Sequence, residues 1–67
     1  MTDKDIAKRI KQYRKRSGLT QVALGKKVGV SSTTIARLER GDNPPSRTTV
    51  ENLAKAFGVT VTDILGR

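Results

Sequence analysis

The feature that most constrains this chain is a two-residue connection, Gly29-Val30, between two short segments with helical apolar spacing. The first segment covers residues 20–28 and the second covers residues 31–40. A connection this short forces the two helices to cross at a steep angle, and Gly29 supplies the positive φ that the corner needs. The pattern over about residues 20–40 therefore predicts a helix-turn-helix.

The apolar residues of this motif fall where two crossing helices must bury side chains. Gly25 is small at the point where the second helix of the motif would pass closest to the first. Because apolar residues three and four apart share one helix face, the remaining positions of the second helix point outward. The inward positions are Leu24, Val28, Val30, Ile35 and Leu38. The outward positions are Thr33, Ala36, Arg37 and Arg40.

A helix is predicted ahead of this motif, over residues 4–17. Thr2 and Asp5 have the spacing of a capping box at its start. Gly18 is suited to end it, since glycine adopts the left-handed conformation that follows many helices. The inner stripe of this helix comprises Ile6, Ile10, Tyr13 and Ser17.

Two further helices are predicted after the motif. Residues 42–45 form a loop, because two prolines cannot continue a helix. Ser46 can cap a fourth helix, and Thr60 with Asp63 can form a capping box for a short fifth helix over residues 61–65. The inward side chains of the fourth helix are Val50, Leu53, Ala54 and Phe57.

The fold class follows from this series of helices. A chain of 67 residues is long enough for one small domain, and residues 1–67 show no strand pattern, internal repeat or linker. We therefore expect an all-α single domain with a modest core. The core side chains are predicted to be Ile6, Ile10, Leu24, Val28, Ile35, Leu38, Leu53, Phe57 and Ile64.

The composition argues against an enzyme. The chain has no cysteine and no histidine, which removes disulfides, thiolate ligands, the commonest general base and the commonest metal ligand. The acidic residues do not form a spaced pair that could perform general acid–base chemistry. We expect no enzymatic activity, no cofactor, no metal and no small-molecule ligand.

The positive charge is concentrated in the first part of the chain. The net charge is +8, and residues 1–27 contain nine Lys or Arg but two Asp or Glu. Such a surface attracts phosphate polyanions and anionic membranes alike. Four lysines are predicted on the outward face of the first helix, where they either contribute long-range attraction or form a solvated face. They are Lys4, Lys8, Lys11 and Lys15.

Membrane and RNA binding are weaker readings of this charge. No apolar run approaches the roughly 18 residues that a membrane span requires, and the N-terminal residues lack the apolar region of a secretory signal. The first helix has only Ile6, Ile10 and Tyr13 as apolar side chains, and the chain has one Tyr and one Phe with which to stack on bases. A cytoplasmic protein is expected.

Two runs of sequence resemble a known family. The run LTQVALGKKVGVSSTTIARLERG, followed by NPPSRTTVENLAKAFGVTVTDIL, resembles the phage repressor and Cro family, also called the Xre family. The opening IAKRIKQYRKRSGLT is similar to regulators of the SinR type. The resemblance covers about Ile6 to Leu65. One departure is Gly25, where the family more often has alanine, and this should cost about 0.5–1 kcal/mol of helix stability.

The resemblance implies a fold and a function. The family fold is a compact five-helix bundle of the lambda-repressor type, and it reads double-stranded DNA in the major groove with the second helix of the motif. Members usually bind as homodimers to pseudo-palindromic operators. The resemblance therefore implies a transcriptional regulator, with repression as the expected output and with Val61 and Leu65 as candidate dimer contacts.

The resemblance also assigns roles to individual residues. Base contacts are expected from Ser32, Thr33, Ala36 and Arg37, with Arg37 suited to O6 and N7 of guanine and Ala36 to a thymine methyl. Arg14 is expected to pair with Glu39 of the third helix, and this ion pair would orient Arg14 towards a phosphate. Phosphate contacts, which fix register without reading sequence, are expected from Arg14, Gln21, Ser31, Arg40 and Arg47.

Alternatives stay open at this point. Some members of the family act as antitoxins or as protein-interaction modules, and the cationic half of the chain does not exclude such a role. The sequence is equally compatible with a stand-alone regulator and with one piece of a longer chain.

Overall fold

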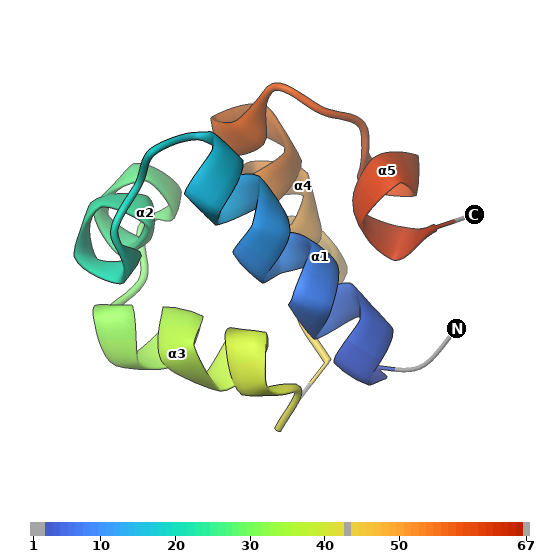
Figure 1. Cartoon of the computed structure of the whole chain (residues 1–67), viewed down its shortest axis with the longest axis horizontal. Coiled ribbons are helices and arrows are strands. Elements are labelled where there is room, and N and C mark those ends of the chain that lie inside the picture. The colour runs from blue at the N-terminus through green and yellow to red at the C-terminus, as the bar shows by residue number, and fades with distance from the viewer. Residues whose placement is uncertain (1–2, 43, 67) are drawn as a thin grey trace.

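The computed structural model describes residues 3–42 and 44–66, in which every regular element is a helix (Figure 1). The prediction of an all-α five-helix domain is therefore confirmed. The first helix begins one residue earlier than predicted and ends before Ser17, while Thr2 of the predicted capping box lies outside the described residues. The helices are α1 (Asp3–Arg16), α2 (Gln21–Val28), α3 (Ser32–Arg40), α4 (Arg47–Phe57) and α5 (Val61–Leu65).

Hydroxyl side chains start four of these helices. Thr20, Ser31, Ser46 and Thr60 each have extended backbone angles, and each side-chain oxygen accepts a hydrogen bond from the backbone N–H three residues later. This satisfies one of the N–H groups that a helix start leaves without a partner. At α5 the predicted capping box is complete, because Asp63 also accepts a hydrogen bond from the backbone N–H of Thr60.

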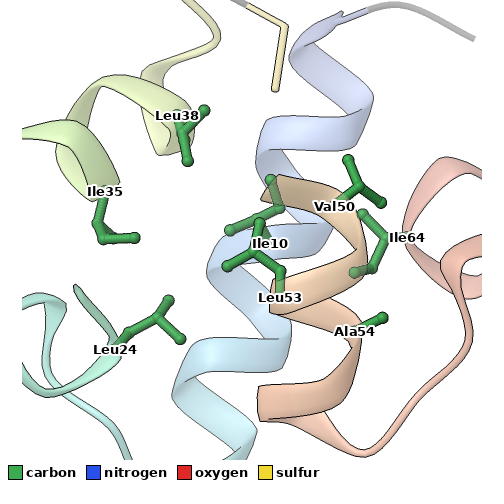
Figure 2. Close-up of a cluster of buried hydrophobic side chains, with 8 residues drawn as sticks. All are labelled: Ile10, Leu24, Ile35, Leu38, Val50, Leu53, Ala54 and Ile64. Atoms are coloured by element: carbon green, nitrogen blue, oxygen red, sulfur yellow. The ribbon is translucent and has the colours of Figure 1, made fainter. Parts of the chain in front are cut away.

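The helices surround one buried cluster (Figure 2). Figure 1 shows α1 crossing in front of α4, with α2 and α3 on one side and α5 on the other. Each helix contributes at least one side chain, because each has an apolar stripe that must be removed from water. The buried side chains of the cluster are Ile10, Leu24, Ile35, Leu38, Val50, Leu53, Ala54 and Ile64.

The predicted core list differs from the observed core at six residues, because Val50 and Ala54, predicted to face inward but absent from that list, are buried as well. Ile6, Val28 and Phe57 are half-buried and pack against the edge of the cluster rather than inside it. Ala7, which was not predicted, is 3% exposed. It is buried because the first turns of α1 lie against Gly41, the residue that ends α3, where a Cβ would stand 3.6 Å from the Cβ of Ala7.

The corner between α2 and α3 is built as the sequence predicts. Gly29 ends α2 with φ +79° and ψ +28°, in the left-handed region that glycine adopts without strain. The backbone then returns over α2, and the N–H of Val30 donates to the carbonyl of Gly25 at 2.9 Å.

The corner gives Gly25 a packing role beside its expected cost in helix stability. An ideal Cβ at Gly25 would stand 2.6 Å from the carbonyl oxygen of Val30 and 3.2 Å from the carbonyl carbon of Ser31. Both contacts are with backbone, so alanine would require the turn to shift. In this chain Gly25 permits the close approach of the corner, in addition to any loss of helix propensity.

None of the described helices has the length and apolar character needed to cross a membrane.

Candidate nucleic-acid interface

The side of α3 away from the core carries the predicted base-contacting residues. Thr33 and Arg37 are exposed, while Ser32 and Ala36 are half-buried beside them. Ile35, on the opposite side of the same helix, is fully buried. The core anchors α3 through Ile35 and Leu38, and α3 itself lies along one edge of the molecule (Figure 1). We call Ser32, Thr33, Ala36 and Arg37 the α3 face.

Three helix starts share a feature that favours anions. The first turns of α2, α3 and α4 contain no acidic residue, whereas the first turn of α5 contains Asp63. The first N–H groups of a helix point outward without intrahelical partners, and the helix dipole places partial positive charge there. A phosphate can therefore approach the starts of α2, α3 and α4 without meeting a carboxylate of the first turn.

Arg14 and Glu39 form the expected ion pair. Arg14 Nε donates to Glu39 Oε2 at 2.6 Å and Nη2 donates to Oε1 at 3.1 Å, while Nη1 donates to the carbonyl of Leu19 at 2.9 Å. The two side chains are only 12% and 4% exposed. The pair therefore joins α1 to α3 inside the protein, and its contribution is not that of an exposed surface pair.

The contact with Glu39 favours the charged form of Arg14. The hydrogen bonds with Glu39 raise the pKa of Arg14, burial lowers it, and the charge of Glu39 raises it again, so that the result lies above the ordinary value. Arginine is charged at physiological pH in any case, and the pair with Glu39 makes loss of the Arg14 proton harder still. Three of the five N–H groups of its guanidinium are engaged by Glu39 and Leu19.

Gln21 is the third side chain at this junction. Its Nε2 donates to Glu39 Oε1 at 3.3 Å, so one carboxylate connects α1, α2 and α3. From the sequence Gln21 is expected at a phosphate, and its hydrogen bond to Glu39 is not predicted. The one available signal was that Gln21, Arg14 and Glu39 all occupy positions that the family resemblance singles out.

The other predicted phosphate contacts lie on the surface. Arg40 Nη2 lies 2.9 Å from Asp42 Oδ2, and Arg47 Nε lies 3.6 Å from Glu51 Oε2. The side chains of Arg40 and Arg47 are 65% and 80% exposed. Exposed pairs of this kind are weak, so a phosphate can replace the carboxylate at small cost. Ser31 uses its hydroxyl as the cap of α3, accepting from the N–H of Thr34 at 3.2 Å.

The lysines of α1 form an exposed row, as predicted. Lys4, Lys8, Lys11 and Lys15 are all exposed. The row begins close to the end of α3, because a Cβ on Gly41 would stand 3.2 Å from Lys4 Cγ. The positive surface of α1 therefore continues from one end of α3.

Within residues 3–42 and 44–66 there is no group of three acidic side chains that could hold a metal ion. Two open hollows lie along α4, and α3 lines neither of them.

Comparison with known proteins places the chain among transcription regulators. The family model described as Helix-turn-helix matches residues 10–64. An HTH-type transcriptional regulator of Methanocaldococcus jannaschii, MJ0272, is 45% identical over 56 residues, which are 84% of this chain and 85% of the relative. The immunity repressor of Bacillus phage phi105 is 41% identical over 61 residues, 91% of this chain but 42% of the repressor.

A less similar relative is named as an antitoxin and not as a transcription regulator. Antitoxin PezA of Streptococcus pneumoniae is 34% identical over 61 residues, which are 91% of this chain and 39% of the antitoxin. The chain therefore spans less than half the length of the phi105 repressor and of PezA.

Solved structures share the arrangement of helices. The biofilm regulator SinR in complex with DNA has a TM-score of 0.84 at 34% identity, and the match covers 90% of this chain and 97% of SinR. The P22 c2 repressor in complex with a synthetic operator has a TM-score of 0.83, also at 34% identity, over 88% of this chain and 89% of the repressor. Two proteins solved with DNA thus have the fold described above.

Proposed function

The chain belongs to the helix-turn-helix family of transcription regulators, as the phage repressor and Cro resemblance indicates, and on that premise we propose that it binds double-stranded DNA sequence-specifically. The observation that carries the proposal is the α3 face, on which Thr33 and Arg37 are exposed, together with three helix starts whose first turns lack acidic residues. The major groove admits one α-helix, so α3 can enter it with this face towards the bases.

Within this proposal the α3 face reads the bases. Arg37 is the strongest candidate, because an exposed guanidinium can donate two hydrogen bonds to O6 and N7 of guanine. Thr33 and Ser32, in the first turn of α3, offer hydroxyl groups to base edges. Ala36, on the same face of α3, offers its methyl group to a thymine methyl.

Phosphate contacts hold the protein in register. Gln21 lies at the start of α2, Ser31 at the start of α3 and Arg47 at the start of α4, so each stands beside free backbone N–H groups. Arg40 would exchange Asp42 for a phosphate. Arg14 has two N–H groups beyond the three engaged with Glu39 and Leu19, and these are what it can offer to DNA.

We further propose a homodimer that binds a pseudo-palindromic operator. Val61 and Leu65 on α5 are half-buried and pack at the edge of the core, which leaves part of each side chain for a partner. Two copies related by a two-fold axis would present their α3 helices to half-sites about one helical turn apart. The expected output is repression in the cytoplasm, as the similarity to a phage immunity repressor supports.

A role in protein binding is the second candidate. The similarity to antitoxin PezA favours it, although that relative is less similar than the regulators. The two roles are separable, because DNA binding that depends on neutralised phosphates weakens steeply with salt. For four to six phosphates per protomer the slope of log affinity against log salt should be about −4 to −5.

The test of the proposed function is selection from random DNA. Duplexes that the purified protein retains at moderate salt are amplified and sequenced, which yields the motif, its symmetry and the half-site spacing together. We expect a motif with two-fold symmetry. A protein that retains no duplex even at low salt would overturn the proposal.

A further inference from the structure

Glu39 lies at a junction where three helices meet through a single carboxylate. It accepts hydrogen bonds from Arg14 of α1 and Gln21 of α2, and its side chain is 4% exposed. We infer that Glu39 is a positioning residue for DNA binding, which holds the Gln21 side chain so that a second amide N–H faces a phosphate. This inference rests on the proposed function, because it specifies how one phosphate contact is prepared.

The chemistry of the two groups fixes the orientation of the amide. An ionised carboxylate only accepts hydrogen bonds, so the end of Gln21 that meets Glu39 is the nitrogen, Nε2. Nε2 carries two N–H groups, of which one is directed to Oε1. The other lies in the plane of the same amide group, on a side chain that is half-buried and therefore partly open to solvent at the first position of α2. It is therefore available to a phosphate oxygen at that helix start.

Holding Gln21 in this way lowers the cost of binding. A glutamine side chain has several rotatable bonds, and immobilising such a side chain in an interface costs affinity. The bond to Glu39 restricts those torsions before DNA arrives. The benefit is preorganisation and needs no contact between Glu39 and DNA.

Arg14 makes this arrangement possible. Its two hydrogen bonds to Glu39 fix the plane of the carboxylate. Glu39 Oε1 accepts from both Arg14 Nη2, at 3.1 Å, and Gln21 Nε2, at 3.3 Å. The positive charge of Arg14 also balances the negative charge of Glu39. A phosphate bound by Gln21 therefore meets a neutral pair and not a bare carboxylate.

The test is a double-mutant cycle with Gln21→Ala, Glu39→Gln and the double variant. Glu39→Gln keeps the shape and one oxygen acceptor for Arg14 but removes its counter-charge, so the variant should be less stable, and a single amide oxygen no longer serves both neighbours. Affinity for a random-sequence duplex is measured by fluorescence anisotropy at a temperature where circular dichroism shows each variant folded. We expect Glu39→Gln to weaken binding about three- to tenfold, the range for ordering one flexible side chain.

The decisive comparison is between the two backgrounds. In Gln21→Ala the same Glu39→Gln change should weaken binding by about twofold or less, since there is no side chain left to position. An equal loss in both backgrounds would overturn the inference, because Glu39 would then act through the fold alone. Arg47→Gln serves as the control, because the Arg47 side chain lies on α4 and pairs with Glu51. The fold loss of affinity in Arg47→Gln should therefore be the same with and without Gln21→Ala.

A measurement on the free protein separates this inference from the proposed function. The side-chain amide protons of Gln21 give their own nuclear magnetic resonance signals, and those signals should move in Glu39→Gln but not in Arg47→Gln. Unchanged Gln21 signals in Glu39→Gln would overturn the positioning role even if the protein binds DNA. A wild-type protein that binds no duplex would instead remove the proposed function, which leaves nothing for Gln21 to be positioned for.

Discussion

Arg14 and Glu39 stand 25 positions apart in the sequence, yet two hydrogen bonds join their side chains inside the protein. Removing one partner would leave the other as a charge with little access to water. Unpaired buried charges are among the most destabilising defects in small domains. The pair is therefore required for the stability of the contact between α1 and α3.

The first prediction concerns the stability of this contact. Arg14→Ala should lower the free energy of unfolding by about 3–5 kcal/mol, because Glu39 would remain buried without a counter-charge. Urea denaturation followed by circular dichroism measures the loss. The matched control is Arg47→Ala, which breaks the exposed pair with Glu51 and should cost about 0–1 kcal/mol. Similar losses in the two variants would contradict the burial of the Arg14 pair.

The second prediction concerns pH. The pKa of Arg14 is raised in the folded state, so its contribution to stability is fully present below the ordinary arginine pKa. It is lost only as the pH rises through the raised value, which lies in strongly alkaline solution. With no histidine or cysteine in the chain, the free energy of unfolding should change by less than about 1 kcal/mol between pH 6 and 9. Urea titrations across that range would detect a larger change and disprove the expectation.

The third prediction concerns the helix-turn-helix corner. Gly25→Leu should destabilise the protein by about 1–3 kcal/mol, since the new side chain meets the backbone of Val30 and Ser31. Leucine favours helix more than glycine does, so helix propensity alone predicts the opposite sign. Lys26→Leu, an exposed neighbour in the same helix, should change stability by about 0.5 kcal/mol or less. A stabilised Gly25→Leu variant would show that the corner is not closely packed.

The fourth prediction separates base reading from phosphate binding. Arg37→Ala should cost about 1–3 kcal/mol on the selected motif and relax the preference at one position. Arg47→Ala should weaken specific and random duplexes alike, because a phosphate contact carries no sequence information. Both variants are compared on the selected motif and on random DNA. Equal losses on the two duplexes for Arg37→Ala would refute its base-reading role.

The fifth prediction concerns assembly. Leu65→Glu should abolish two-copy binding to the symmetric motif, because a carboxylate would have to enter the proposed α5 contact. Sedimentation of the protein with a duplex of one motif gives the stoichiometry directly. Thr62→Glu places the same charge at an exposed position of α5 and should leave two copies bound. One wild-type copy per operator would defeat the dimer.

The sequence by itself determined the helices and where they start and end. Ser31 and Ser46 are short hydroxyl residues that compete with the backbone for hydrogen bonds, and Gly29 can adopt a positive φ, so each acts through its nearest neighbours. The same holds for the separation of Ile35 from Arg37 onto opposite sides of α3, which needs only the helical period. These features are local, and local chemistry can be read along a chain.

Only the tertiary structure decided the contacts between residues that are remote in the sequence. That Ala7 is buried follows from the approach of α1 to Gly41, and the atoms that a side chain at Gly25 would meet are backbone atoms of Val30 and Ser31. That Gln21 is held by Glu39 follows from the meeting of α1, α2 and α3. Helical periodicity specifies which side of each helix faces inward, but the spacing and angle at which the helices pack are set by all their side chains together.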